Sequence, residues 1–240
     1  MKNLRTFAIV DYLKEKKYCS IIELQEHFGV SSATIHRDIA SLVSRDVIQK
    51  VHGGVAIQEN SAARSGKKVD PSPFMERINW NRKSKLAISQ RAFSYICEGD
   101  ILFLDSSTTV SYLADLLIGS NFSNLTIVTN SVTIIANFHR FPSHFVLISL
   151  GGSFDLQLNA FLGQTAVREL ERLSISKAFI SAFGVNDDDV TTNHENHASL
   201  LTKVLDMAQQ KYLLADKSKF NRCGLFKLAS KRSFDEIISD

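Results

Sequence analysis

The sequence has few of the residues that mark secreted, metal-bound or membrane proteins. Its 240 residues include only three cysteines, which are far apart, form no disulfide or zinc pattern and fit a reducing cytoplasm. No run of about 18 apolar residues is present, so neither a membrane-spanning helix nor a membrane partner is expected. The start, MKNLRTFAIVDYL, has too short an apolar part for a signal peptide. We therefore expect a cytoplasmic globular protein.

The sequence also has little net charge, and its positive excess is concentrated in one stretch. The formal net charge is only +3, divided as +1 in residues 1–60, +5 in residues 61–85 and −3 in residues 86–240. Concentrated positive charge is typical of a segment near an anionic partner, but a solvated basic linker has the same composition. Charge alone leaves both interpretations open.

The first sixty residues contain three short helical patterns. Apolar residues recur at helical spacing over residues 4–13. Ser20 and Glu23 form the S-x-x-E capping box of a second helix, IIELQEHF, which Gly29 ends. Residues 30–42, VSSATIHRDIASL, follow after a turn short enough for a helix-turn-helix unit.

The third helix has an apolar side and a polar side. Ile35, Ile39 and Leu42 recur at helical spacing and are predicted to face a core. The other side carries short polar groups and an arginine. These suit a DNA major groove, because hydroxyls reach phosphates or base edges and arginine binds guanine or phosphate. The candidate DNA contacts on this helix are Ser32, Thr34, His36, Arg37 and Ser41.

A short hairpin is predicted after the third helix. Residues 47–51 alternate like a strand, Gly53 and Gly54 supply a tight turn, and residues 55–57 form the return strand. Three helices and a hairpin make a winged helix-turn-helix, although a small three-helix protein-interaction module remains an alternative. The wing residues expected against the DNA backbone are Lys50, His52 and Gly53.

The run SSATIHRDIASLVSRDVIQKVHGGV resembles the N-terminal signature of the DeoR family of bacterial transcriptional regulators. The usual form of that signature is S-x-x-T-I-R-R-D-L, followed by a wing ending in H-G-G. His36 replaces the first of the two usual arginines, which bears on the operator sequence or the affinity. The resemblance implies binding of double-stranded operator DNA by residues 1–58. The matching positions are Thr34, Ile35, Arg37, Asp38, Lys50, His52, Gly53 and Gly54.

The rest of the chain is predicted to be a linker and a larger domain. Residues 59–75 are polar, hold two of the three prolines and lack apolar periodicity, so they are predicted to be the linker. A helix with a solvated basic start is expected over about 80–97. From residue 101 short apolar runs alternate with helical patterns, which predicts a mostly parallel sheet covered on both faces. The predicted fold class is α/β, with a winged helix-turn-helix domain followed by this parallel-sheet domain over residues 76–240.

Small polar residues follow several of the predicted strands. Ligands of parallel sheets bind beyond the carboxyl ends of the strands, where helix N-termini attract anions. Hydroxyls, glycines, a carboxylate and a lysine together suit a phosphorylated sugar or polyol, whereas each residue alone is equally consistent with a helix cap or a turn. The candidate effector contacts are Asp105, Ser106, Thr108, Thr109, Thr129, Asn130, Ser131, Gly151, Gly152, Asp216 and Lys219.

Four blocks extend the family resemblance over nearly the whole chain. DSSTT, TNS, GG and DKSKF resemble D-S-G-T-T, T-N-S, G-G and D-S-S-K-F of the DeoR sensor domain. That domain is related to sugar-phosphate isomerases such as ribose-5-phosphate isomerase, and typically senses a phosphorylated intermediate of sugar metabolism. Ser107 replaces the usual glycine, and residues 197–201 lack the usual acidic residues and lysine. These departures imply either a changed effector or a weakened pocket.

Motifs for metal binding and catalysis are missing. His194 and His197 are spaced i, i+3, whereas metalloprotease helices need i, i+4 and a third ligand, so no metal site is expected. Asp187–Asp189 lacks the ligand spacing of a calcium loop. There is no G-x-S-x-G elbow, Walker loop or cysteine nucleophile with a matched base, so neither catalytic residues nor cofactors are expected.

Three functions remain open on these observations. The first is a repressor of a carbohydrate-metabolism operon, a homodimer or homotetramer that a phosphorylated sugar releases from DNA. The second is a sugar-phosphate isomerase with an attached DNA-binding domain, for which Asp105, Asp216 and Lys219 are the candidate acid–base groups. The third is a regulator whose sensor domain serves only for oligomerisation. We expect the first, without enzyme activity.

Overall fold

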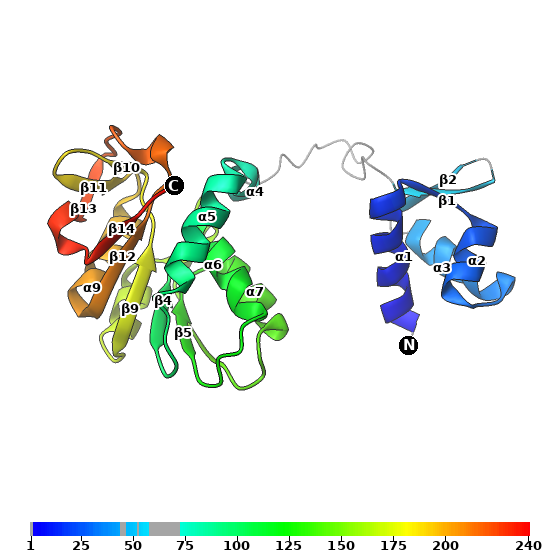
Figure 1. The fold of residues 1–240 in the computed structure, drawn as a ribbon, viewed down its shortest axis with the longest axis horizontal. Helices are drawn as coiled ribbons and strands as arrows, with labels where there is room; N and C mark the ends of the chain where they lie inside the picture. The colour runs from blue at the N-terminus through cyan, green and yellow to red at the C-terminus, as the bar shows by residue number, and fades with distance from the viewer. Residues whose placement is uncertain (1, 44–46, 52, 58–72) are drawn as a thin grey trace. The chain divides into compact units, whose positions relative to one another are not determined.

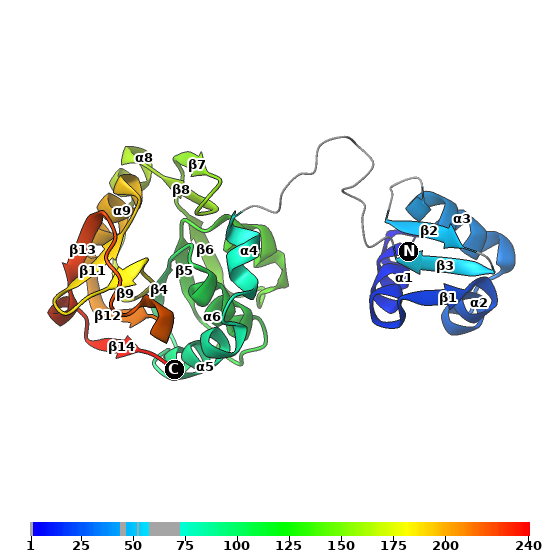
Figure 2. The same ribbon diagram turned by 90° about the horizontal axis from the view of Figure 1, so that it is seen from above.

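The computed structural model describes residues 2–43, 47–51, 53–57 and 73–240. The chain divides into two compact units, Met1–Asp70 and Pro71–Asp240. Figures 1 and 2 show the N-terminal unit in blue and cyan, and the second unit in colours from turquoise to red. His52 and residues 58–72, which include most of the predicted linker, lie outside the described residues.

The N-terminal unit combines helices with a small antiparallel sheet. The sheet order is β1-β3-β2, so β1 adds a strand to the predicted hairpin. It fits closely against β3 because Gly54 has no side chain, and a Cβ atom there would lie 2.3 Å from the carbonyl oxygen of Cys19. The described elements are α1 (Lys2–Lys16), β1 (Tyr18–Ser20), α2 (Ile21–Phe28), α3 (Ser32–Val43), β2 (Ile48–Val51) and β3 (Gly54–Ile57).

Local sequence signals determine where α2 begins and ends. Ser20 Oγ accepts a hydrogen bond from the Glu23 N–H at 3.1 Å, as the capping box predicts. Gly29 ends the helix in the left-handed conformation, with φ of 58°. The buried side chains between the helices and the sheet are Ile9, Leu13, Cys19, Leu24, Ile35, Ile39, Leu42, Ile48 and Val55.

The second unit alternates strands and helices along the chain. Its described helices of six or more residues are α4 (Pro73–Asn79), α5 (Arg82–Phe93), α6 (Thr108–Ile118), α7 (Val132–Asn137), α8 (Gln164–Leu170) and α9 (Glu195–Met207). Its described strands are β4 (Ile101–Leu104), β5 (Thr126–Thr129), β6 (Val146–Ser149), β7 (Ser153–Asp155), β8 (Ala160–Leu162), β9 (Ile175–Ile180), β10 (Gly184–Val185), β11 (Asp189–Thr192), β12 (Ala208–Leu214), β13 (Phe226–Ser230) and β14 (Glu236–Ile238).

A six-stranded parallel sheet lies at the centre of this unit. Its order is β14-β12-β9-β4-β5-β6, and every neighbouring pair is parallel. Helices α5 to α7 cover one face, and α8 and α9 cover the other (Figure 1). Side chains of β4 alternate between the two cores, with Leu102 and Leu104 on the α5–α7 side and Phe103 on the α8–α9 side. The predicted α/β fold with a doubly covered sheet is confirmed.

The predicted helix over about 80–97 is wrong in its bounds. Two helices, α4 and α5, meet at a corner formed by Trp80 and Asn81. Asn81 has φ of 53°, and its Nδ2 donates a hydrogen bond to Asp216 Oδ1 at 3.1 Å. Because this hydrogen bond joins residues far apart in sequence, the apolar periodicity does not predict the corner between the two helices. Helix α4 also begins inside the stretch assigned to the linker, at Pro73.

Two small antiparallel sheets supplement the central sheet. Strands β10, β11 and β13 form one, and β7 and β8 form the other. The apolar pattern does not indicate them, because most of these strands are only two to four residues long. The connection from β11 to α9 contributes to the cavity described below.

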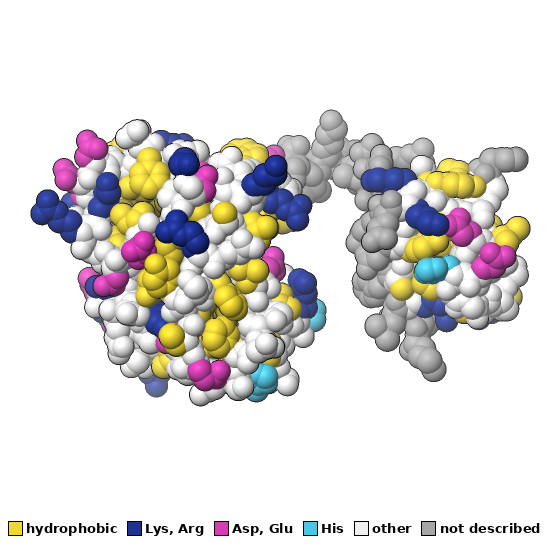
Figure 3. Space-filling model, in the orientation of Figure 1, with side chains coloured by type: hydrophobic (Ala, Val, Ile, Leu, Met, Phe, Trp, Pro, Cys, Tyr) yellow, Lys and Arg dark blue, Asp and Glu magenta, His cyan; other side chains and the backbone are white. Residues whose placement is uncertain are grey.

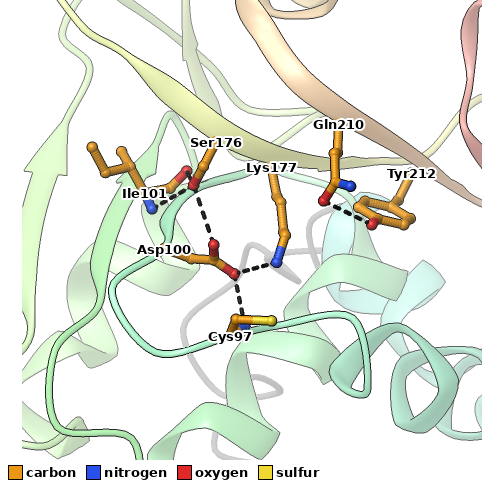
Figure 4. Close-up of polar contacts among 7 residues, drawn as sticks. All are labelled: Cys97, Asp100, Ile101, Ser176, Lys177, Gln210 and Tyr212. Atoms are coloured by element: carbon orange, nitrogen blue, oxygen red, sulfur yellow. Dashed lines mark hydrogen bonds and ion pairs between the residues drawn. The ribbon is translucent and has the colours of Figure 1, made fainter.

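A buried ion pair joins the central strands at their amino ends (Figure 4). Lys177 Nζ lies 2.7 Å from Asp100 Oδ2, which also accepts the Cys97 N–H at 2.7 Å. Ser176 Oγ accepts the Ile101 N–H at 2.7 Å, so β4 and β9 are also linked through a side chain. These contacts hold the end of the sheet opposite to the polar loops.

The surface seen in Figure 3 is mixed in character. Basic and acidic side chains lie interspersed over the second unit, with hydrophobic side chains between them. Large apolar side chains that are exposed in this unit include Val146, Phe154, Leu156 and Leu225. Within the described residues, no helix has the length and apolar character needed to cross a membrane.

Candidate functional site

Helix α3 presents a polar outer side, and its apolar side is buried. Ile35 and Ile39 are fully buried, whereas Ser32, His36 and Arg37 are exposed. The two further candidates on this helix, Thr34 and Ser41, are partly exposed. All five candidate DNA contacts of this helix are therefore at least partly exposed.

The N-terminus of α3 is ordered by Ser31. Its carbonyl oxygen accepts hydrogen bonds from the Thr34 and Ile35 N–H groups at 3.0 Å, and its Oγ lies 2.9 Å from Thr34 Oγ1. The hydroxyl of Thr34 is thus oriented by a neighbour while it remains partly exposed. Short hydroxyl side chains held in this way suit close approach to a phosphate.

An ion pair that the sequence analysis does not identify attaches α3 to α1. Arg5 Nε lies 2.6 Å from Asp38 Oδ2, and Asp38 is only 1% exposed. Asp38 lies between Ile35 and Ile39 on the apolar side of the helix, and this position is the signal that predicts its burial. The pair fixes the orientation of the outer side of α3 because a buried carboxylate needs its partner.

The wing is formed by β2 and β3. Lys50 is exposed on β2, and Gly53 has φ of 80° in the turn. His52, the other candidate contact on the wing, lies outside the described residues. The two described wing residues are thus available to a ligand that meets the turn.

A cavity of about 300 Å³ lies in the second unit. Its walls include residues that directly follow β4, β9 and β12, so it sits at the carboxyl ends of parallel strands, where ligands of such sheets bind. The α4–α5 corner and the connection from β11 to α9 supply the remaining walls. Five of the predicted effector residues line it, namely Ser106, Thr108, Thr109, Asp216 and Lys219.

Asp105 is predicted as an effector contact but lies behind the cavity wall. Its carboxylate oxygens accept hydrogen bonds at 2.8 Å from the Ser107 and Ser181 N–H groups. Burial raises the pKa of Asp105 to about 6, against the lowering effect of the hydrogen bonds from Ser107 and Ser181. Asp105 thus ties the loop after β4 to the loop after β9.

The structure places the TNS block within the loop network that follows β5. Thr129 Oγ1 donates to the Leu104 carbonyl oxygen at 2.6 Å and accepts the Ser131 N–H at 3.0 Å. Asn130 Nδ2 donates to the Phe161 carbonyl oxygen at 3.2 Å, and Ser131 caps α7. None of the three residues lines the cavity, so in this structure they order the adjacent loops.

Gly151 and Gly152 also lie away from the cavity walls. The Gly151 N–H donates to Glu169 Oε2 at 2.6 Å. Gly152 has φ of 126°, and a Cβ atom there would lie 2.4 Å from the Leu162 carbonyl oxygen. Gly152 therefore allows the chain to pass close to β8 as it enters the β7–β8 hairpin.

Ser107 forms the N-cap of α6, the helix that points its first turn at the cavity. It has φ of −70°, and its Oγ accepts the Val110 N–H at 3.2 Å, so the side chain at the usual glycine position strengthens the helix start. Thr108 and Thr109 stand in the first turn, whose N–H groups have no partner within the helix, and both line the cavity. This end of α6 favours an anion.

Basic side chains dominate the charge of the cavity walls. Arg77, Lys85, Lys219 and Arg222 line it, and Asp216 is the one carboxylate among the described lining residues. Burial lowers the pKa of Lys85 to about 8, while Asp216 acts in the opposite direction. Burial also lowers the pKa of Lys219 and that of Arg77. Lys85 is buried and Arg77 and Lys219 are half-buried, so cations with this little compensating charge bind an anion favourably.

Three of these cations are not among the predicted effector contacts. Arg77 and Lys85 belong to the basic stretch 61–85, which sequence analysis assigns to the linker or to a solvated helix start. Lys85 is in fact 4% exposed, and its Nζ donates to the Arg77 carbonyl oxygen. Arg222 lies over the Phe183 ring at 4.4 Å from the centroid. The excess positive charge of residues 61–85 is the sequence signal that points to Arg77 and Lys85.

Two histidines complete the cavity walls. His194 precedes α9, and His197 in its first turn is 6% exposed. Thr192 Oγ1 lies 3.3 Å from His197 Nδ1. Burial lowers the pKa of His197 to about 4. No group of three metal-ligating side chains occurs in the described part of the chain.

Both units of the chain match known protein families. Residues 5–61 match the DeoR-like helix-turn-helix domain, and residues 80–240 match the DeoR C terminal sensor domain. The chain is 31% identical over 240 residues to the L-fucose operon activator of Haemophilus influenzae, with 99% of this chain and 92% of that protein aligned. It is 27% identical over 235 residues to the glycerol-3-phosphate regulon repressor of Escherichia coli, with 97% and 88% aligned.

Among solved structures, sugar-phosphate isomerases are similar to part of this chain. Ribose 5-phosphate isomerase A of Methanocaldococcus jannaschii matches with a TM-score of 0.41 and 15% identity. The match covers 58% of this chain and 55% of that chain.

Proposed function

The chain belongs to the DeoR family of transcriptional regulators, and from that premise we propose that it represses a carbohydrate-metabolism operon until a phosphorylated sugar releases it from operator DNA. Two relatives bear names that tie them to an L-fucose operon and to a glycerol-3-phosphate regulon. The observation that carries the proposal is a cavity lined by four cations and one carboxylate among its described residues, in the same chain as an exposed, hydroxyl-rich helix.

The DNA contact is proposed to be the outer side of α3. Ser32 and Thr34 near its start are short enough to let the backbone approach phosphates, while Arg37 reaches a base edge or a phosphate. Lys50 on the wing adds a contact to the backbone of the duplex. His36 contributes a hydrogen bond without a permanent charge.

The effector is proposed to bind in the cavity of the second unit. A phosphate monoester carries close to two negative charges near neutral pH, which suits the excess of cations in the walls. The first turn of α6 and its hydroxyls supply hydrogen-bond donors for the phosphate oxygens. Asp216 and Asn81 supply groups for the hydroxyls of the sugar.

Coupling between the two sites is proposed to follow from subunit arrangement. A homodimer or homotetramer binds two half-sites about 34 Å, or a multiple of this, apart. The effector favours an arrangement in which the two α3 helices no longer match those half-sites, so it weakens DNA binding by differential affinity. The second unit begins at Pro71, and three residues soon after it line the cavity, namely Arg77, Trp80 and Asn81. The effector therefore contacts the stretch of the second unit that follows the N-terminal unit in sequence.

Arg37→Ala tests the DNA contact. A bidentate arginine contact contributes about 1–3 kcal/mol, so specific affinity is expected to fall roughly 5- to 150-fold in fluorescence anisotropy at physiological salt. Arg82→Ala is the matched control, because it removes an exposed arginine that does not line the cavity. Equal affinity of the Arg37 variant and the control for the operator would remove Arg37 from the interface.

The two alternative functions give different results. The matched family consists of transcription regulators, so the chain is not an enzyme and the isomerase hypothesis is set aside. A sensor that serves only for oligomerisation would leave operator binding intact and bind no sugar phosphate in a calorimetric screen. Our proposal requires binding of at least one of these esters and a lower operator affinity in its presence.

A further inference from the structure

One polar atom in the cavity wall lacks a partner. His197 Nε2 is buried, and no hydrogen-bond partner for it is found among the described residues. Its other ring nitrogen, Nδ1, lies 3.3 Å from Thr192 Oγ1. A buried polar atom without a partner is unfavourable, so a group that pairs with Nε2 from within the cavity gains affinity by doing so.

The ring is neutral at physiological pH. Burial is the largest cause that lowers the pKa of His197 to about 4, His194 and Arg77 also lower it, and Asp155 raises it. A neutral imidazole has one donor and one acceptor nitrogen. Since Thr192 engages Nδ1, a single hydrogen-bonding role is left at Nε2. A hydroxyl donates or accepts, so it complements either tautomer.

The cavity walls carry both charged and uncharged groups. Asp216 raises the pKa of Lys85 and of Lys219, so both lysines lie within reach of the same carboxylate. His197 lines the same cavity with an imidazole that is uncharged at neutral pH. A ligand that fills the cavity therefore meets cations and a neutral hydrogen-bonding ring.

We propose that His197 is the specificity-determining residue of the cavity, its Nε2 hydrogen-bonding a hydroxyl of an effector whose phosphate is held by Lys85 and Lys219. Thr192 is a positioning residue that orients the imidazole ring. The inference rests on the proposed function, since it assumes that the cavity binds a phosphorylated sugar, and it adds which residue selects the sugar part.

Two substitutions separate the hydrogen bond from the packing. His197→Leu fills a similar volume without a polar atom, and His197→Gln retains a side chain able to pair with a hydroxyl. The full-length chain and both variants are titrated with inorganic phosphate and with a panel of pentose and hexose phosphates. Trp80, the single tryptophan, lines the cavity and reports binding by its fluorescence. Thermal melts of the variants verify that they are folded.

For the tightest ester, His197→Leu is expected to weaken binding about 10- to 100-fold, whereas His197→Gln retains most of the affinity. Inorganic phosphate, which has no sugar hydroxyl to pair with His197, should bind all three proteins alike. Among the monodeoxy analogues of that ester, one is expected to lose affinity for the wild type and not for His197→Leu.

Two results would overturn the inference, and they are distinguishable. If His197→Leu binds the tightest ester as well as the wild type does, the role of His197 is refuted and the proposed function stands. If the wild type binds neither inorganic phosphate nor any ester of the panel, both the proposed effector class and the role of His197 fall.

Discussion

Between about pH 7 and pH 4, two buried side chains are expected to change the stability of the second unit in opposite directions. The first is His197, whose pKa burial lowers from 6.5 to about 4. Between these values the unfolded chain binds a proton that the folded chain excludes, so the free energy of unfolding falls as the pH falls. At about 1.4 kcal/mol per pKa unit, the loss amounts to about 3 kcal/mol.

Asp105 has the opposite effect over nearly the same interval. Its pKa is raised from 3.8 to about 6 by burial. Here the folded chain binds the proton that the unfolded chain does not, so the free energy of unfolding rises as the pH falls from 6 towards 3.8. The gain is again about 3 kcal/mol. In the wild type the two contributions nearly cancel.

Replacing one of the two side chains leaves the pH dependence of the other one visible. In His197→Gln only Asp105 titrates abnormally, so the free energy of unfolding of this variant is expected to rise by about 3 kcal/mol as the pH falls from about 6.5 to 4. In Asp105→Asn only His197 does so, and the free energy of unfolding is expected to fall by a similar amount over the same interval. The assay is urea unfolding followed by the fluorescence of Trp80, the single tryptophan, which lies in this unit. Asp105→Asn also loses one hydrogen bond at every pH, which shifts its stability without changing the slope against pH.

The difference in slope between the two variants is the decisive quantity, because all other titrating groups are common to both. If the two variants and the wild type lose stability in parallel as the pH falls, the burial argument for both groups is refuted.

Three further substitutions probe the contacts described above. Lys219→Ala removes a cavity cation and is expected to weaken sugar-phosphate binding about tenfold or more with operator affinity unchanged, and an unaltered inducer titration would remove Lys219 from the site. Lys177→Met leaves the largely buried Asp100 carboxylate with the Cys97 N–H but without its cation, and should lower the free energy of unfolding of the second unit by about 1–3 kcal/mol in urea, whereas a loss below 1 kcal/mol would show that the pair is hydrated. Arg5→Met should destabilise the N-terminal unit by about 1–3 kcal/mol and weaken operator binding, and normal values for both would show that Asp38 needs no partner.

Local patterns predict much of the N-terminal unit. The capping serine Ser20 and the terminating Gly29 act through neighbouring backbone groups, and the apolar spacing of α3 identifies Ile35 and Ile39 as core. Strand β1 is not predictable in this way, because its pairing depends on the close approach of Cys19 to a glycine far along the chain.

In the second unit, the apolar runs predict the parallel sheet but only part of the cavity. Residues in the loops that follow strands, such as Ser106 after β4 and Asp216 after β12, are identified by position alone. Lys85 and His197 lie on helices and reach the cavity through the packing of elements distant in sequence. Thr129 is predicted as a ligand contact because it is a hydroxyl residue at the end of a strand. In the structure its hydroxyl instead orders the loop by a hydrogen bond to the Leu104 carbonyl oxygen, and the sequence does not distinguish these two uses.

The central claim is that α3 binds operator DNA under the control of the cavity. Its most direct test is the fluorescence anisotropy of the full-length chain with duplexes from its own upstream region, measured with and without the sugar-phosphate panel. We expect tight binding of one duplex at physiological salt, with a dissociation constant of roughly 10⁻⁸ M or below, and weaker binding when one ester is added. Failure to bind any of these duplexes even at low salt would contradict the account.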